Sequence, residues 1–342
     1  MSRKVNSSLT DVSEFGNPCF EDEYRRLFFW INGVILNTTG LLGIIGNIIS
    51  LIILSKPHMR SSINHLLINL ARCDIILIVT SILHFGLPMV YPYTGYLRFY
   101  YLKIFPIQSF VVYPVATIVR TANTYLTLAV TLERYVAVVY PLKAKALCTY
   151  YRAKLYVYSI FLICILFNIP KFFEIALKES MDDEYGTVYC LKATDFRKNP
   201  CYVRWYINWI SNIFIIYIPF FSITIINTLI YLKIRKINRH RQQMNWMEIR
   251  ELKLASILFG IVIVFLCCNI LPLILNIVEA IYKTIDARVV KMSNLLLTIN
   301  SSVNFLIYVA YGEKFRNCFK EMFYRRKKSL ENPQECLTFQ TK

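Results

Sequence analysis

The sequence predicts an all-α membrane protein, a seven-transmembrane helix bundle followed by a short amphipathic cytoplasmic helix. Three observations lead to this fold class: seven long apolar spans, basic residues gathered on one side, and polar groups at matching depths inside the spans. Of 342 residues, 56% are hydrophobic and only 18% are charged. Most spans reach the about 20 apolar residues that a helix needs to cross a bilayer.

The spans are the long apolar runs that separate the charged segments. They are Leu27–Leu54, Ile63–Tyr91, Ile107–Val130, Leu155–Pro170, Tyr206–Leu232, Leu254–Tyr282 and Met292–Ala310. The fourth is short, and its ends are poorly marked. We therefore expect an extracellular tail over residues 1–26, a seven-transmembrane domain over 27–311, and an amphipathic helix with a cytoplasmic tail over 312–342.

The basic residues identify the cytoplasmic side. The net charge of +18 would suggest nucleic acid as the partner of a soluble protein, but here the lipid bilayer explains it better. The segments after spans one, three and five and the carboxyl-terminal tail are basic, whereas alternate segments are mixed or acidic, as in Glu21-Asp22-Glu23. By the positive-inside rule we expect a multi-pass plasma-membrane protein with its amino terminus outside. Asn6, in an Asn-Ser-Ser sequon, is then a glycosylation candidate.

Polar groups from four spans fall in one slab of the membrane. Asp74 lies roughly 16 Å from the cytoplasmic start of span two, and Asn123 lies at a similar depth in span three. The other members are Asn47, Asn300, Ser301 and Asn304. A carboxylate among amides either forms a polar switch, which could hold water or a sodium ion, or only joins helices by hydrogen bonds. No other metal, and no cofactor, is expected.

Charged residues mark both ends of span three. At the inner end, in Glu133-Arg134-Tyr135, Arg134 either pairs with its neighbouring carboxylate in a closed state or snorkels to headgroups. Glu251, at the inner start of span six, is a second partner. In the outer half, Arg120 faces either a ligand pocket or an internal carboxylate. Arg72, in span two, lies nearly opposite Asp74 on its helix and near enough to the inner leaflet to snorkel.

Motifs of one receptor family recur along Leu27–Arg326. They are Gly46-Asn47, Leu70-Ala71-Arg72-Cys73-Asp74, Glu133-Arg134-Tyr135, Pro219, Phe265-Leu266-Cys267-Cys268-Asn269-Ile270-Leu271-Pro272 and Asn300-Ser301-Ser302-Val303-Asn304-Phe305-Leu306-Ile307-Tyr308. The chain resembles a rhodopsin-like (class A) G-protein-coupled receptor. Its runs MRSSINHLLINLARCD, TLERYVAVVYPLKAKALCTYYRAK and NLLLTINSSVNFLIYVAYGEKFR resemble the invertebrate FMRFamide-type peptide receptors.

The resemblance implies that an extracellular amidated neuropeptide binds and that a heterotrimeric G protein is activated. The chain is then no enzyme and has no catalytic residues. The coupling residues would be Glu133, Arg134, Tyr135, Tyr308 and Glu251. The alternatives are a receptor for another peptide class, such as a myosuppressin-like peptide, or a transporter or ligand-gated channel.

Some positions depart from the family pattern. Phe305 follows Asn304 where the family has proline, and Ile270 stands where it has tryptophan. Ser109 lies near the place of the cysteine that most members carry at the top of span three. The predicted outer cysteines are Cys19, Cys190 and Cys201, and Cys190 is expected to pair with one of the other two.

The outer half of the chain suits a peptide ending in arginine and an aromatic amide. An amine receptor of this family would carry an aspartate in the outer part of span three. The corresponding region here, Val115-Ala116-Thr117, has no carboxylate, so a biogenic amine is disfavoured as the ligand. The predicted ligand residues are Glu279, Glu174, Arg120, Tyr113 and Trp209. Glu279 or Glu174 would neutralise the peptide's arginine, with aromatic rings stacking on it. Alternatively, the acids balance Arg204 or Lys171, and the aromatic residues form an interfacial belt.

After span seven, apolar residues recur at helical spacing. Phe315, Cys318, Phe319, Met322 and Phe323 form one face, and basic residues form the other, which suits an anionic leaflet. Cys318 is either palmitoylated or a buried thiol on that face.

Overall fold

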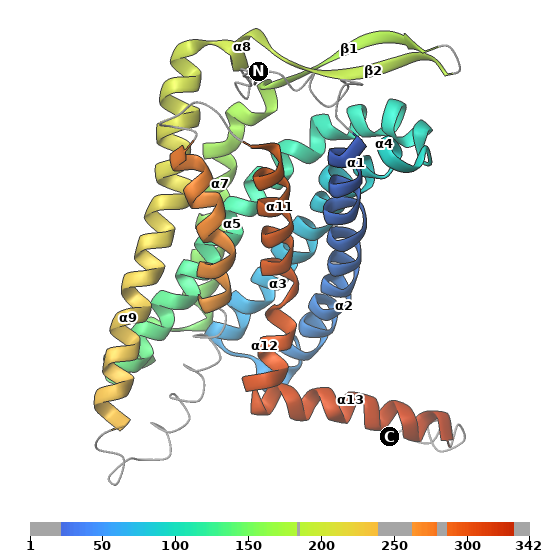
Figure 1. Ribbon diagram of the computed structural model, residues 1–342. Coiled ribbons are helices and arrows are strands. Elements are labelled where there is room, and N and C mark those ends of the chain that lie inside the picture. Colours follow the sequence, from blue (N-terminus) through green and yellow to red (C-terminus); the bar gives the residue numbers. More distant parts are fainter. Residues whose placement is uncertain (1–21, 183–184, 239–261, 279–285, 332–342) are drawn as a thin grey trace.

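The computed structural model of the chain describes residues 22–182, 185–238, 262–278 and 286–331. Six of its helices are long and apolar enough to cross a membrane. They are Tyr24–Leu54, Ser62–Thr94, Tyr100–Val139, Tyr150–Phe173, Tyr202–Lys236 and Ala287–Ala310. A shorter apolar helix, Val262–Val278, lies inside the predicted sixth span. The helices form one bundle, which confirms the predicted fold class (Figure 1).

The structure extends several spans beyond their predicted ends. The helices are α1 (Asp22–Phe28), α2 (Asn37–Leu54), α3 (Ser62–Ser81), α4 (Tyr91–Thr94), α5 (Phe105–Val139), α6 (Pro141–Leu147), α7 (Tyr150–Asn168), α8 (Asp195–Lys198), α9 (Ile218–Asn238), α11 (Ala287–Ser302), α12 (Asn304–Tyr311) and α13 (Glu313–Glu331). Short 3₁₀ turns cover Pro57–Met59, Leu87–Met89 and Ile169–Phe173. Span four is longer than predicted because it continues through polar residues at both ends.

The half of the bundle predicted to be extracellular is the less regular one. Its spans contain π-helical turns over Phe29–Leu36, Ile82–Gly86, Tyr100–Ile104, Tyr202–Ser211 and Ile213–Tyr217. Such turns insert an extra residue into a helical turn and are frequent at functional sites.

Side chains that cap the first turn fix where several helices begin. Ser61 Oγ accepts a hydrogen bond from the Asn64 amide at 3.2 Å and starts α3. Asp286 Oδ1 accepts from the Arg288 amide at 2.8 Å and starts α11. Each cap satisfies a backbone donor that has no partner within its helix.

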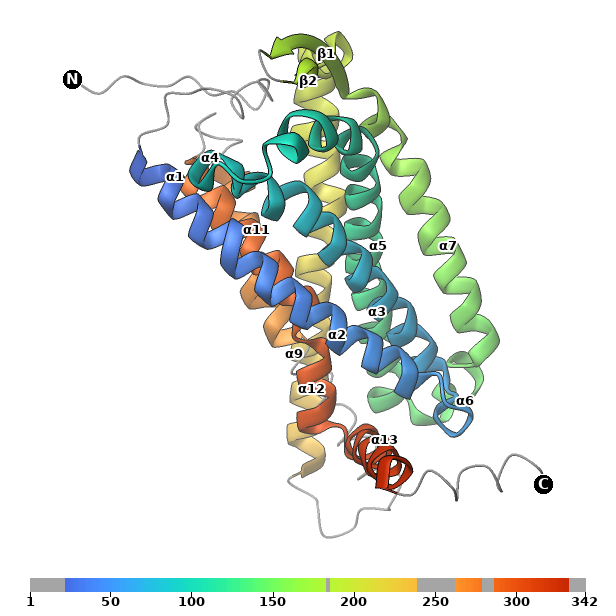
Figure 2. The ribbon, with the colours of Figure 1, turned by 90° about the vertical axis from the view of Figure 1, so that its right-hand side faces the viewer.

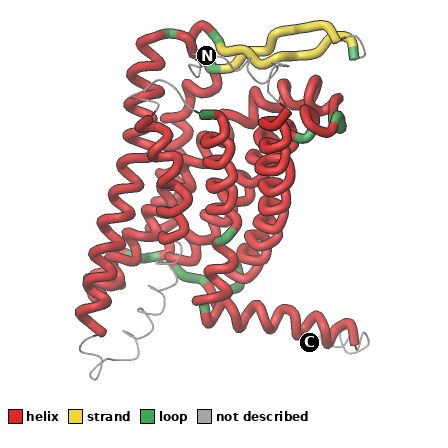
Figure 3. The backbone as a smooth tube through the Cα atoms, viewed as in Figure 1, coloured by secondary structure: helices red, strands yellow, loops and turns green. Residues whose placement is uncertain are grey.

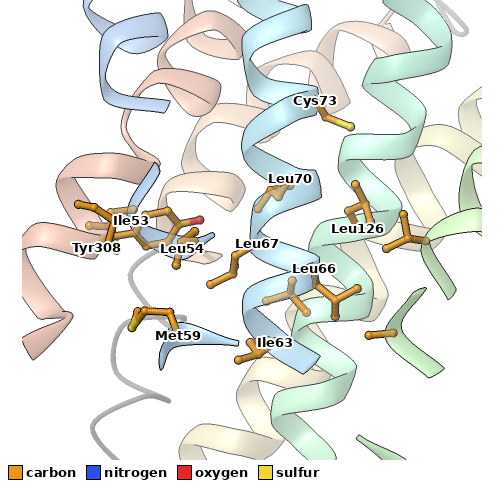
Figure 4. Close-up of a cluster of buried hydrophobic side chains, with 14 of the residues drawn as sticks. Ile53, Leu54, Met59, Ile63, Leu66, Leu67, Leu70, Cys73, Leu126 and Tyr308 are labelled. Atoms are coloured by element: carbon orange, nitrogen blue, oxygen red, sulfur yellow. The ribbon is translucent and has the colours of Figure 1, made fainter. Parts of the chain in front are cut away.

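The helix α5 lies at the centre of the bundle. It packs against α3, α7 and α9, while α2 packs against α3 and α11 (Figure 2). A large apolar cluster fills the end of the bundle nearest α13 and includes Ile53, Leu66, Leu70 and Leu126, all nearly inaccessible (Figure 4). The outer face of α2 is instead exposed and apolar, with Leu42 71% exposed, as suits a surface in contact with lipid.

A β-hairpin, which the sequence did not lead us to expect, covers the other end of the bundle (Figure 3). β1 (Ile175–Asp182) and β2 (Gly186–Ala193) are antiparallel, with Ile175 opposite Ala193 and Asp182 opposite Gly186. Gly186 has a φ of 67°, which glycine adopts without steric cost. Val188, Leu191 and Ala193 of β2 are buried.

The predicted amphipathic helix is α13, which leaves the bundle sideways after α12 (Figure 1). Phe315 and Cys318 are buried on its inner face, and the Phe319 ring lies 5.5 Å from that of Phe305. Lys314 and Lys320 are exposed on the opposite side. The side chain of Phe323 lies outside the described part.

Candidate functional site

Asp74 is the centre of a buried polar cluster that joins three spans. Its side chain is 1% exposed. Asn123 Nδ2 of α5 donates to Oδ1 at 2.7 Å, and Asn304 Nδ2 of α12 donates to Oδ2 at 2.7 Å. Charge-assisted bonds of this length are stronger than those between neutral groups, and the surrounding helices exclude water from them. The relative position of three helices therefore depends on one carboxylate.

A fourth span joins the cluster through Asn47 of α2. Asn47 Nδ2 donates to the carbonyl of Gly43 at 3.0 Å and to that of Ser301 at 2.9 Å. The Ser301 side chain also lies near enough to the Asp74 carboxylate to act on it electrostatically. Asn300, one residue earlier, is half-buried, and no hydrogen bond joins its side chain to the cluster within the described residues.

The cluster contains oxygen atoms that suit a sodium ion. They belong to Asp74, to Ser301 and to Asn47, whose Oδ1 is buried without a hydrogen-bond partner. Each carboxylate oxygen accepts one amide hydrogen and keeps a second lone pair, so an ion would share these oxygens with Asn123 and Asn304. No group of three or more histidine, cysteine or acidic residues suited to a metal occurs among the described residues.

The predicted coupling residues lie at the end of the bundle nearest α13. Arg134 is 6% exposed and Tyr308 is 3% exposed, with the Tyr308 ring 5.5 Å from that of Phe315. Glu133 accepts a hydrogen bond from Ser62 Oγ of α3 at 3.0 Å. Tyr135 is half-buried, and its ring meets that of Tyr140 edge to face. Glu251 lies outside the described residues.

Glu174 is held by side chains of this chain. Lys171 Nζ lies 2.9 Å from Oε1, and Arg197 Nε of α8 lies 3.6 Å from Oε2. The hydroxyls of Tyr113 and Tyr202 donate to the same carboxylate at 2.8 and 2.7 Å. Burial opposes the ionisation of Glu174, but the two cations and the hydrogen bonds outweigh it and hold the pKa below its ordinary value.

This arrangement changes the interpretation of Glu174. Of the two alternatives, the internal pairing with Lys171 is the one present, and Glu174 is 1% exposed. A ligand's guanidinium would have to displace Lys171 or Arg197. Glu174 therefore connects spans three, four and five beneath the β-hairpin, and Tyr113 is part of that connection. The sequence feature that indicates this internal pair is the spacing of three residues from Lys171 to Glu174.

The remaining predicted ligand residues are not brought together within the described part. Arg120 of α5 is half-buried, and its guanidinium forms no hydrogen bond or ion pair with any described residue. Trp209 is 52% exposed on span five. Glu279 lies outside the described residues. Arg120 was predicted to face either a ligand pocket or an internal carboxylate. Among the described residues, no carboxylate forms an ion pair with it.

Several outer aromatic residues have packing roles that the sequence did not reveal. The Tyr100 hydroxyl donates to the carbonyl of Leu83 at 2.8 Å and also contacts Gln108 Nε2. The rings of Tyr91 and Tyr101 lie 5.0 Å apart. By contrast, Tyr96 is 77% exposed.

Cysteine pairing and modification were predicted at two places. Cys190 and Cys201 are both free and exposed, so the disulfide between them is absent, while Cys19 and Asn6 lie outside the described residues. Cys318 is buried and its Sγ lies 3.1 Å from His58 Nε2. This favours the buried thiol over palmitoylation.

Comparison with known proteins identifies what the chain is similar to. A family model described as "7 transmembrane receptor (rhodopsin family)" matches residues 46–308. The chain is 49% identical to an FMRFamide receptor of Drosophila melanogaster over 93% of its own length and 58% of that protein. It is 30% identical to the FMRFamide peptide receptor frpr-18 of Caenorhabditis elegans, over 81% of the chain and 65% of that protein. The probable G-protein coupled receptor frpr-1 of the same nematode is 28% identical over 87% of the chain.

Proposed function

The chain belongs to the rhodopsin family of seven-transmembrane receptors, and from this premise we propose that it is a receptor for an extracellular FMRFamide-like peptide. The observation that carries the proposal is the 49% identity to the Drosophila melanogaster FMRFamide receptor over 93% of the chain. The chain spans 58% of that receptor's length. On binding, the receptor activates a heterotrimeric G protein at the plasma membrane.

The polar cluster around Asp74 is the proposed switch. One carboxylate accepts hydrogen bonds from α5 and from α12, so the two helices cannot shift independently. A ligand that favours a second arrangement of these helices changes the populations of the two states. At the other end of the bundle, Arg134 and Tyr308 are buried together with the apolar cluster, and an outward movement of span six would expose them to the G protein.

The peptide site lies in the irregular half of the bundle. Arg120 offers a half-buried guanidinium without a partner among the described residues, which suits the carbonyl of a carboxyl-terminal amide. The peptide's arginine needs an acid, and Glu174 is already neutralised by Lys171 and Arg197. Glu279 is therefore the proposed counter-ion, with Trp209 available for stacking.

The test applies a panel of amidated peptides to cells that express the chain and measures calcium and cyclic AMP. Peptides ending in arginine–phenylalanine amide are expected to act at nanomolar concentrations. Glu279→Gln should weaken them by about tenfold or more, whereas Glu179→Gln, on exposed β1, should not. A response to another peptide class alone would refute the ligand, and no response to any peptide would refute the function.

A further inference from the structure

Three polar residues of α3 form a row of hydrogen-bonding groups that runs from buried Asn69 to exposed Arg72. His65, Asn69 and Arg72 are four and three residues apart, so they share one face of the helix. Arg72 Nη1 donates to Asn69 Oδ1 at 3.3 Å, and Asn69 Nδ2 lies 3.4 Å from His65 Nε2. The bond to Asn69 turns the guanidinium of Arg72 toward the start of α3.

Beside His65, near the start of α3, two basic side chains lie over the ring of Tyr150. The guanidinium carbon of Arg60 lies 4.4 Å from the ring centroid, and Lys154 Nζ lies 5.3 Å from it. The His65 ring meets the Tyr150 ring edge to face at 4.9 Å. Arg72 and Lys154 both lie near enough to His65 to act on it electrostatically.

No acid of the described part of the chain neutralises the cations of this cluster. Within the described residues, Arg60, Arg72 and Lys154 form no ion pair, and all three side chains are exposed. Glu133, the nearby acid, bonds instead to Ser62. Arg60 and Lys154 converge on the Tyr150 ring and repel each other, and an anion between them would remove that repulsion.

The position of the cluster in the membrane indicates which kind of anion it binds. The cluster lies where two helices that pack against each other, α3 and α7, both begin, and Arg60 belongs to the turn just before α3. Arg72 lies about 15 Å along α3 from its start, on a lipid-facing surface where an uncompensated charge is costly. Because the guanidinium of Arg72 is turned toward the start of α3, it approaches the headgroup region, where the phosphates of the bilayer lie.

We propose that the surface between α3 and α7 binds one acidic phospholipid. Its phosphate is held by Arg60 and Lys154, and Arg72 contacts its ester oxygens. The site differs from general attraction to an anionic leaflet because Arg60 and Lys154 lie over one aromatic ring and Arg72 is oriented by Asn69. That the leaflet is the cytoplasmic one rests on the proposed orientation, but the binding itself does not.

The test uses the full chain purified in a neutral detergent and titrated with phosphatidylserine or with phosphatidylcholine. Native mass spectrometry measures the bound lipid. Phosphatidylserine should bind more tightly, and Arg60→Gln with Lys154→Gln should weaken it by roughly 25-fold, about fivefold for each charge removed. The matched control removes the same charge from exposed α6, as Lys143→Gln with Lys145→Gln, and should leave binding unchanged.

Substitutions of the deeper arginine give a second, independent measurement. Arg72→Gln should weaken phosphatidylserine binding by about fivefold, whereas Arg72→Lys, which keeps the charge, should retain most of it. Equal losses in the Arg60–Lys154 variant and the Lys143–Lys145 control would overturn the proposal, as would equal binding of the two lipids. Displacement of the lipid by inorganic phosphate at equal concentration would show a free-phosphate site instead.

Discussion

Asp74 accepts a hydrogen bond at each carboxylate oxygen, and an asparagine in its place could accept only one of the two as they are now arranged. Asparagine has one acceptor oxygen, so its own amide hydrogens would face the amide of Asn123 or of Asn304. A donor facing a donor in a buried site leaves two groups unsatisfied.

We predict that Asp74→Asn lowers the free energy of unfolding by about 1–3 kcal/mol and weakens agonist-driven G-protein activation. Thermal unfolding in detergent and a cyclic AMP assay measure the two effects. The control is Asn227→Ala, because Asn227 is buried and, among the described residues, bonds only to the Ile223 carbonyl of its own helix. Normal activation by the Asp74 variant would show that the cluster only holds helices together.

Glu174 predicts a dependence of stability on pH. Because its pKa in the folded protein is depressed, its contribution is present above the ordinary value of 4.5 and is lost as the pH falls through the folded pKa. Glu174→Gln should cost roughly 3–5 kcal/mol at neutral pH, since it leaves Lys171 and Arg197 without a counter-ion. The difference from the unmodified protein should shrink in acid.

Thermal unfolding at several pH values measures this effect. Glu179→Gln is the matched control, because Glu179 is exposed on the same hairpin. If the Glu174 variant and the unmodified protein differ in the free energy of unfolding by the same amount at neutral and at acid pH, that result would contradict an ionised Glu174 paired with Lys171 and Arg197.

At the scale of elements, α2 and α11 approach closely because Gly43 has no side chain. A Cβ at this position would lie 2.9 Å from the Ser302 Cα, which is backbone and cannot rotate away. The same contact brings the Ser301 carbonyl within reach of Asn47. The packing of two helices and the geometry of the polar cluster thus depend on one glycine.

We predict that Gly43→Ala lowers stability by about 1–3 kcal/mol, because α11 must move away from α2. Agonist responses should weaken as well, since the Asn47–Ser301 bond lengthens. Thermal unfolding and cyclic AMP assays measure both. Leu42→Ala, at a 71% exposed neighbouring position, is expected to change little. Unchanged stability of the glycine variant would mean that the two helices can separate freely.

The sequence predicted the spans well because apolar length alone decides what can cross a bilayer. It predicted the depth of Asp74, Asn123 and Asn304 for the same reason, since helical rise is constant. The depth of a residue in the membrane does not determine the direction in which its side chain points around the helix axis. Asn300 shares the depth but lies about 100° around the helix from Ser301, and so it misses the cluster.

The outer end of the bundle was less predictable. The sequence left open whether Glu174 neutralises the peptide's arginine or balances Arg204 or Lys171, and it does not show that Arg197 and Tyr202 fold back onto it. These partners come from segments that meet only in three dimensions. The hairpin strands likewise carry several charged residues, as in Lys178 and Glu179, which are depleted in most strands.

At the scale of the whole molecule, the distribution of charge decides the orientation in the membrane. Basic residues after spans one, three and five resist translocation, so the amino terminus should lie outside and the carboxyl terminus inside. We predict that an amino-terminal epitope tag binds antibody on intact cells, whereas a carboxyl-terminal tag does so only after permeabilisation. Asn6→Gln should abolish a mass shift on treatment with a glycosidase, because only an outer tail is glycosylated. Both tags on one side would exclude an odd number of crossings, and with it the receptor topology.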